Sequence, residues 1–195
     1  MTTLKAEKRD MSVKAKALRR QGKITGNVYG KEMKEAIPIQ FDATEASRFL
    51  KAHAKGSQAI LELDGKNMNV LLKDMSYDPT NHIYNDVNFQ SLVEGEKVHS
   101  TAPVILLNED QMKGFLTHNL TEVAYKAAPS ALIEKIEIDL STLAIGTNLL
   151  VGDLDIAKNK DIDLITPADT SILHIAEHQK NGVMTDDAEA ETVEA

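Results

Sequence analysis

The sequence predicts a mainly β protein with some α-helix: a small closed N-terminal β-barrel with two helices, a β-rich second domain and a disordered acidic tail. Alternating apolar and polar residues, clearest at Ile136, Ile138 and Leu140, are typical of half-buried strands. Clear helix signals are confined to two segments in the first half of the chain. Residues 179–195 contain five acids, one lysine and no aromatic residue, a composition that does not build a packed core.

The first domain is placed at residues 1–92 and opens with a short basic helix. Good helix formers occupy residues 13–21, and Gly22 is positioned to end the helix. Two β-prone segments follow at residues 26–30 and 37–41. The second helix should then run from Asp42 to about residue 53, because an Asp followed three residues later by a Glu resembles a capping box.

The rest of the first domain reads as a hairpin and a closing strand. Residues 59–63 and 68–72 flank an Asp-Gly pair, which supplies the positive φ angles of a two-residue turn. An Asp-Pro pair at residues 78–79 marks another turn, and the last strand passes through Val87 and Phe89. Short strands with two helices predict a small barrel-like unit.

The second domain is placed at residues 93–178 and should consist mainly of five short strands. We expect them at residues 104–107, 122–126, 133–140, 148–151 and 171–176.

Composition excludes several classes of protein. The 195 residues include no cysteine, which rules out disulfides, thiolate metal sites and thiol nucleophiles and fits a reducing cytoplasm. The N-terminus has no apolar stretch typical of a secretory signal. Apolar runs such as residues 104–107 are far shorter than the roughly 18 residues of a membrane span, so no membrane association is expected.

The charge of the chain is strongly asymmetric. The net charge is −8, yet residues 1–34 hold ten lysines and arginines against three acids, whereas residues 91–195 hold seven against nineteen. An acidic chain with one basic segment predicts a localised contact with a polyanion.

This basic segment is the candidate nucleic-acid contact. Its cations could neutralise several phosphates, although many charge runs are only solvated helix faces. Tyr29 lies between Gly26 and Gly30, where its ring could stack on a ribose or base, and this favours nucleic-acid binding. The cations concerned are Lys14, Lys16, Arg19, Arg20 and Lys23.

A zinc hydrolase is the catalytic alternative. His174, Glu177 and His178 match the spacing of inverted zinc proteases. Such sites need a third protein ligand, and only 17 residues follow, all in the acidic tail. No phosphate-cradling glycine loop and no nucleophile signature occurs elsewhere, so we expect no enzyme activity, no metal and no cofactor.

Several runs together resemble a known family. They are Leu-Lys-Ala-Glu-Lys-Arg at 4–9, Leu-Arg-Arg-Gln-Gly-Lys-Ile at 18–24, Val-Tyr-Gly at 28–30, Val-Leu-Leu-Lys-Asp-Met at 70–75 and Ile-Glu-Ile-Asp-Leu-Ser-Thr-Leu-Ala-Ile-Gly at 136–146. This pattern is similar to the bacterial large-subunit ribosomal protein twenty-five family, in the long form called general stress protein Ctc. The chain departs from the family where His-x-Asp-Phe becomes Asp86-Val87-Asn88-Phe89.

The resemblance implies a cytoplasmic, ribosome-bound protein that binds 5S ribosomal RNA through its N-terminal domain and meets neighbouring large-subunit proteins. Off the ribosome we expect a monomer. The family's RNA contacts correspond to Arg9, Lys14, Lys16, Arg19, Tyr29 and Asn88, to which the basic segment adds Arg20 and Lys23. The alternative is a stress-induced protein-binding module that is not permanently bound to the ribosome.

Overall fold

The computed structural model describes residues 2–31, 33–112 and 114–177. Six strands form a closed barrel in the order β1-β3-β2-β6-β5-β4. It is closed by parallel pairing between β1 and β4, and β2 also runs parallel to β6. The strands are β1 (Thr2–Lys8), β2 (Lys23–Tyr29), β3 (Ile37–Asp42), β4 (Gln58–Leu63), β5 (Lys66–Asp78) and β6 (Ile83–Ser91).

Two helices accompany the barrel, α1 (Ala15–Arg20) and α2 (Ala43–Ala52). Asp42 caps helix α2, because its carboxylate accepts hydrogen bonds from the backbone N–H groups of Thr44 and Glu45 at 2.9 and 3.3 Å. These bonds satisfy donors that the first turn of a helix leaves unpaired. The helix buries Phe49 and Leu50 against the barrel.

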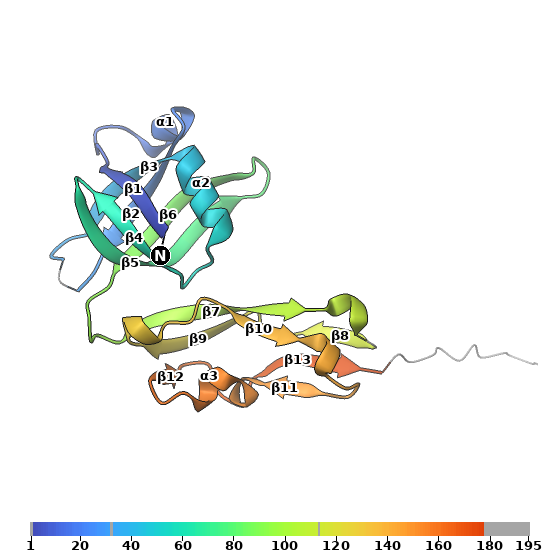
Figure 1. Cartoon of the computed structure of the whole chain (residues 1–195). Coiled ribbons are helices and arrows are strands. Elements are labelled where there is room, and N and C mark those ends of the chain that lie inside the picture. Colours follow the sequence, from blue (N-terminus) through green and yellow to red (C-terminus); the bar gives the residue numbers. More distant parts are fainter. Residues whose placement is uncertain (1, 32, 113, 178–195) are drawn as a thin grey trace, which may run out of the picture.

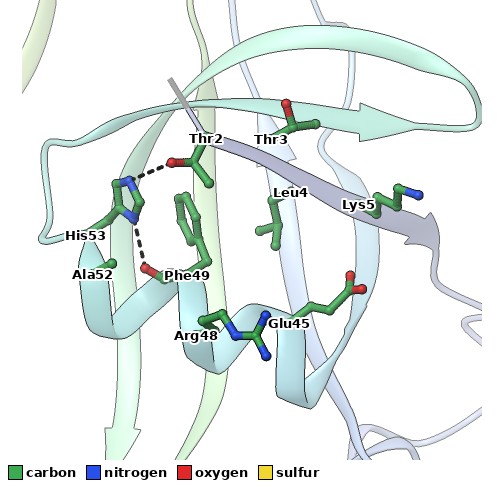
Figure 2. Close-up of a pocket in the computed structure, with 9 residues that line it drawn as sticks. All are labelled: Thr2, Thr3, Leu4, Lys5, Glu45, Arg48, Phe49, Ala52 and His53. Atoms are coloured by element: carbon green, nitrogen blue, oxygen red, sulfur yellow. Dashed lines mark hydrogen bonds between the residues drawn. The ribbon is translucent and has the colours of Figure 1, made fainter.

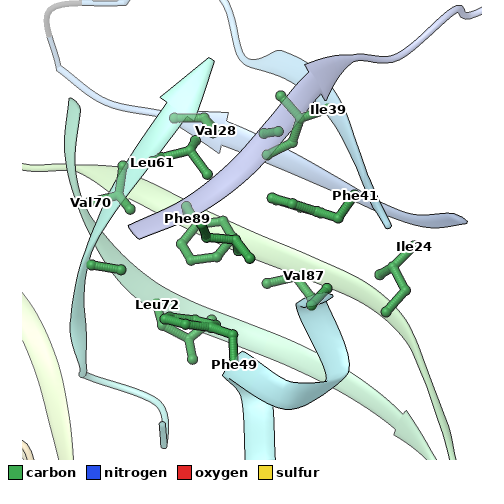
Figure 3. Close-up of a cluster of buried hydrophobic side chains, with 14 of the residues drawn as sticks. Ile24, Val28, Ile39, Phe41, Phe49, Leu61, Val70, Leu72, Val87 and Phe89 are labelled. Carbon is green, nitrogen blue, oxygen red and sulfur yellow. The ribbon is translucent and has the colours of Figure 1, made fainter. Parts of the chain in front are cut away.

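The core of the barrel consists of aliphatic side chains around three phenylalanines (Figure 3). Phe89 lies between the other two, with its ring centroid 5.8 Å from that of Phe41 and 6.4 Å from that of Phe49. Tilted pairs at these separations are favourable for aromatic rings. Packing of α2 on the strands therefore completes the core.

The second unit contains two sheets that share one core (Figure 1). Their strand orders are β10-β7-β9-β12 and β11-β13-β8. A single-turn helix α3 (Asp155–Lys158) and several 3₁₀ turns connect the strands. The strands are β7 (Val98–Leu107), β8 (Phe115–His118), β9 (Glu122–Ala127), β10 (Ile136–Asp139), β11 (Asn148–Leu150), β12 (Ile162–Leu164) and β13 (Ser171–Ala176).

The predicted fold class is confirmed, with corrections to individual elements. The domain opens with strand β1 rather than with the basic helix, which begins at Ala15 rather than residue 13, and β8 and β12 were also not predicted. The strand expected at residues 133–140 covers only β10, because the Tyr125 hydroxyl binds both the N–H and the C=O of Ile133. The acidic tail predicted to be disordered lies outside the described residues.

Candidate nucleic-acid interface

Helix α1 presents basic side chains to solvent. Its one buried residue is Leu18, which packs the helix onto the barrel. Arg19 and Arg20 occupy the last turn, where cations are favoured by the negative end of the helix dipole. Lys14 precedes the helix, and Lys14, Lys16, Arg19 and Arg20 are all exposed.

Arg19 fixes the position of α1 relative to strand β6. Its Nε donates a 3.2 Å hydrogen bond to the backbone oxygen of Asn85. The buried Thr25 hydroxyl lies at 3.3 Å from the same oxygen and 3.0 Å from the carboxylate of Asp86. Helix α1 therefore lies over the end of the β2–β6 pair at which both strands begin.

From this end, a row of polar residues runs along β2 and β6. The parallel register sets Thr25 opposite Asp86, Asn27 opposite Asn88, and Tyr29 opposite Gln90. Because neighbouring strand residues face opposite sides, these six residues face away from the core that Val28, Val87 and Phe89 fill, although Thr25 is itself covered. We call these six residues the polar face.

Tyr29 lies at the end of the polar face away from α1. Its side chain is 36% exposed. Burial of the rest of the ring, together with the charge of Asp74, raises the pKa of the Tyr29 phenol. The hydroxyl therefore stays protonated and can donate a hydrogen bond to a ligand.

Arg9 follows β1 directly. Its backbone N–H donates to the oxygen of Pro38 at 3.0 Å, and its guanidinium reaches the oxygen of Val13 at 3.4 Å. Among the described residues, its buried Nε has no hydrogen-bond partner. Pro38 lies opposite Asn27, so Arg9 borders the polar face across β3.

Lys23 differs from the other predicted cations because its charge is already engaged. Its Nζ lies 3.0 Å from the carboxylate of Glu7, which also accepts a 3.0 Å hydrogen bond from Gln40. The bond from Gln40, followed by Lys23, lowers the pKa of the Glu7 carboxyl. This network joins β1, β2 and β3 at the base of the candidate interface.

The structure thus brings Arg19, Tyr29 and Asn88 onto or against one face of the barrel, with Arg9 at its border. Sequence reasoning did not identify Asn27 as part of this face. The signal was present in the alternation of Thr25, Asn27 and Tyr29 along β2. The parallel pairing that sets Asn27 beside Asn88 joins segments about sixty residues apart and has no local signature.

The zinc-protease motif does not form the helix that it requires. His174 lies on strand β13, while His178 is outside the described residues. Within the described part of the chain, no cluster of three or more His, Asp or Glu side chains is arranged to hold a metal ion.

A cavity of about 380 Å³ lies between the start of β1 and helix α2 (Figure 2). The His53 ring stacks on Phe49, with ring centroids 4.2 Å apart. One ring nitrogen lies 2.9 Å from the backbone oxygen of Phe49, and the other lies 3.2 Å from the Thr2 hydroxyl. These contacts join β1 to the end of α2, which gives His53 a structural role.

Comparison with known proteins agrees with the two-part architecture. Residues 4–89 match the model of the ribosomal L25p family, and residues 97–179 match that of the C-terminal domain of ribosomal protein TL5. The chain belongs to the ribosomal L25p family. Among L25p relatives, the large ribosomal subunit protein bL25 of Dictyoglomus thermophilum is 34% identical over 186 residues, covering 90% of this chain and 89% of the relative.

Other L25p relatives match over similar lengths. The bL25 protein of Exiguobacterium sibiricum is 31% identical over 90% of this chain and 79% of its own length. That of Hahella chejuensis is 30% identical over 97% and 96%. L25p proteins are structural ribosomal proteins rather than enzymes, so the predictions of a non-catalytic ribosomal protein and of a cytoplasmic, ribosomal location are confirmed.

In the described part of this L25p chain, no helix is both long and apolar enough to span a bilayer.

Proposed function

We propose that the chain binds 5S ribosomal RNA through α1 and the polar face. The observation that supports this most strongly is the hydrogen bond from Arg19 to Asn85, which joins the basic helix to the strand that carries Asn88. A charged helix and a polar strand surface thereby form one continuous face. The proposed contact residues are Arg9, Lys14, Lys16, Arg19, Arg20, Lys23, Tyr29 and Asn88.

The two parts of this face suit different parts of an RNA helix. The exposed cations of α1 would neutralise phosphates, which supplies affinity but little sequence information. The shallow minor groove of RNA displays base edges and 2′-hydroxyl groups, which the amide side chains and the Tyr29 hydroxyl could reach. Phosphate contacts would then set the register for contacts to bases.

Titration with 5S ribosomal RNA at several salt concentrations tests this proposal. Counterion release predicts that the logarithm of the binding constant falls linearly with the logarithm of salt concentration, with a slope of several units. Absent binding, or binding that does not depend on salt, would contradict it. Footprinting of the RNA with and without the protein would locate the contact.

We infer that residues 1–92 and 93–178 act as separate domains, and that the acidic second domain meets basic large-subunit proteins, since complementary charge favours association. Off the ribosome the protein would be monomeric, which sedimentation at increasing concentration would check. Cosedimentation with purified large subunits separates this role from that of a stress-induced module without permanent ribosome attachment.

A further inference from the structure

We propose that Asn27 and Asn88 form a paired-amide reader of a nucleobase edge that offers a hydrogen-bond donor beside an acceptor. The inference rests on the proposed RNA binding and adds Asn27 as a residue that determines specificity. The two residues lie opposite each other on parallel strands β2 and β6. Asn27 Nδ2 donates to Asn88 Oδ1 at 3.2 Å.

The hydrogen-bonding capacity of the pair is only partly used. A carboxamide carries two N–H donors and one acceptor oxygen. Within the described residues, Asn27 Oδ1 and Asn88 Nδ2 have no hydrogen-bond partner, and neither atom is sealed from solvent. The pair therefore leaves the Asn27 oxygen free as an acceptor and the Asn88 amide nitrogen free as a donor. Turning both amides over exchanges the two roles but leaves the same pattern.

The surroundings hold the pair in place. Both side chains are half-buried and belong to inner strands of the closed barrel. Along the two strands, the hydrogen-bonded Thr25 and Asp86 flank the pair on the side nearer α1, and Tyr29 and Gln90 flank it on the other side. A ligand would therefore meet amide groups that folding has already ordered, so binding costs little further conformational entropy.

This pattern selects a class of base edge. In paired RNA this edge lies in the narrow major groove, but loops and bulges expose it on unstacked bases. There adenine presents a donor at N6 beside an acceptor at N7 and is the usual partner of asparagine amides, whereas guanine presents two acceptors and suits arginine. The Asn27–Asn88 pair thus complements an adenine-like edge. Arg9 and Arg19, at the borders of the polar face, are suited to guanine or phosphate.

The test compares Asn27→Val, Asn88→Val and the double variant in 5S RNA titrations over a range of salt concentrations. Valine suits strand positions and removes both hydrogen-bonding groups. Each single variant should bind about tenfold more weakly, as expected for loss of a base-edge contact, with an unchanged salt slope. The double variant should bind no more than about twofold more weakly than the weaker single variant, because the pair acts as a unit.

Asn67→Val is the matched control, since Asn67 is an exposed asparagine on strand β5 of the same barrel and should leave binding unchanged. If Asn27→Val lowers the melting temperature substantially, Asn27→Asp replaces it, because the carboxylate keeps the size of the amide but removes the donor to Asn88. It should weaken binding at least tenfold.

The outcomes distinguish a failure of RNA binding from a failure of the paired-amide reader. If the unmodified protein fails to bind 5S RNA, the proposed function fails and this inference fails with it. If it binds with the expected salt dependence but the folded variants bind equally well, or if the losses simply add, only the paired-amide reader is wrong.

Discussion

Lys16 and Lys23 carry the same charge in different surroundings, and this difference predicts different contributions to RNA binding. Lys16 is exposed on α1, whereas Lys23 is paired with Glu7 at 3.0 Å. Lys16→Ala should lower the salt slope of 5S RNA binding by about one, the value for one lost phosphate contact. Lys23→Ala should lower it by less, because Glu7 already neutralises that charge. Parallel titrations of the two variants provide the measurement.

Glu7→Gln supplies the control for this comparison. Removing the carboxylate charge frees the Lys23 ammonium, so the affinity for RNA and the salt slope should both rise. Equal slopes for the Lys16 and Lys23 variants would show that the ion pair opens when RNA binds.

At the level of single residues, the sequence identified the charged and aromatic candidates for RNA contact, but not the side-chain partners that these residues have in the fold. Lys14, Lys16, Arg19 and Arg20 are visible as a cluster because they are adjacent in the chain. The engagement of Lys23 by Glu7 and the pairing of Asn27 with Asn88 depend on strand register instead. Register between distant strands is set by tertiary packing and leaves no mark on local composition.

Helix α2 offers a prediction at the level of the element. The Asp42 carboxylate accepts hydrogen bonds from the backbone N–H groups of Glu45 and Thr44. These bonds, with that from Glu45 having the larger effect, lower the pKa of the carboxyl. The ionised cap thus stabilises the fold above the ordinary carboxyl pKa of about 4, and this stabilisation is lost as the pH falls through the lowered folded-state pKa. Asp42→Ala should lower the melting temperature at pH 7 by about 3 °C, measured by circular dichroism.

Asp42→Asn distinguishes the hydrogen bonds of this cap from its charge. Asparagine caps helices about as well as aspartate, so this variant should retain most of the stability at pH 7. Its stability should vary less between pH 5 and 2 than that of the unmodified protein, because position 42 no longer titrates. Identical acid profiles would exclude Asp42 from the pH response.

The elements that the sequence predicted well are those with strong local chemistry. The Asp42 cap begins α2 as expected, and the Asp-Gly turn joins β4 to β5. The elements that it missed depend on partners. Strand β12 has three residues and exists by pairing with β9, while β5 extends to Asp78 because a bulge near Lys73 lets it continue along β6.

Charge is segregated across the whole molecule. Helix α1 lies at the end of the barrel away from the second unit (Figure 1), so the cations of α1 and the acidic strands lie far apart. This separation allows RNA to approach α1 with little repulsion from the second unit, since exposed charges are largely screened beyond about 10 Å at 0.1 M salt.

The junction between barrel and second unit depends on Gly56. The Gln58 amide of the barrel donates to the oxygen of Pro129 at 2.6 Å, and the Lys73 ammonium donates to the oxygen of His99. Gly56 has a φ of +88°, and a Cβ added there would lie 2.1 Å from the backbone oxygen of Thr101. Only a residue without a side chain allows the two backbones to approach so closely.

Gly56→Ala should therefore push the second unit away from the barrel. We expect a larger radius of gyration in small-angle X-ray scattering and a loss of stability of about 3 kcal/mol, from backbone strain and steric overlap together. Binding of 5S RNA should persist, because α1 and the polar face lie on the barrel alone.

Comparison with Gly146→Ala separates the steric part of this effect from the backbone strain. Gly146 has the same φ of +88° but no atom within 4 Å of an added Cβ, so its substitution introduces strain without overlap. It should cost only about 1 kcal/mol and leave the scattering profile unchanged. If the two variants scatter alike, Gly56 does not control the junction. If Gly56→Ala abolishes RNA binding while the barrel remains folded, the second unit contributes to the RNA interface.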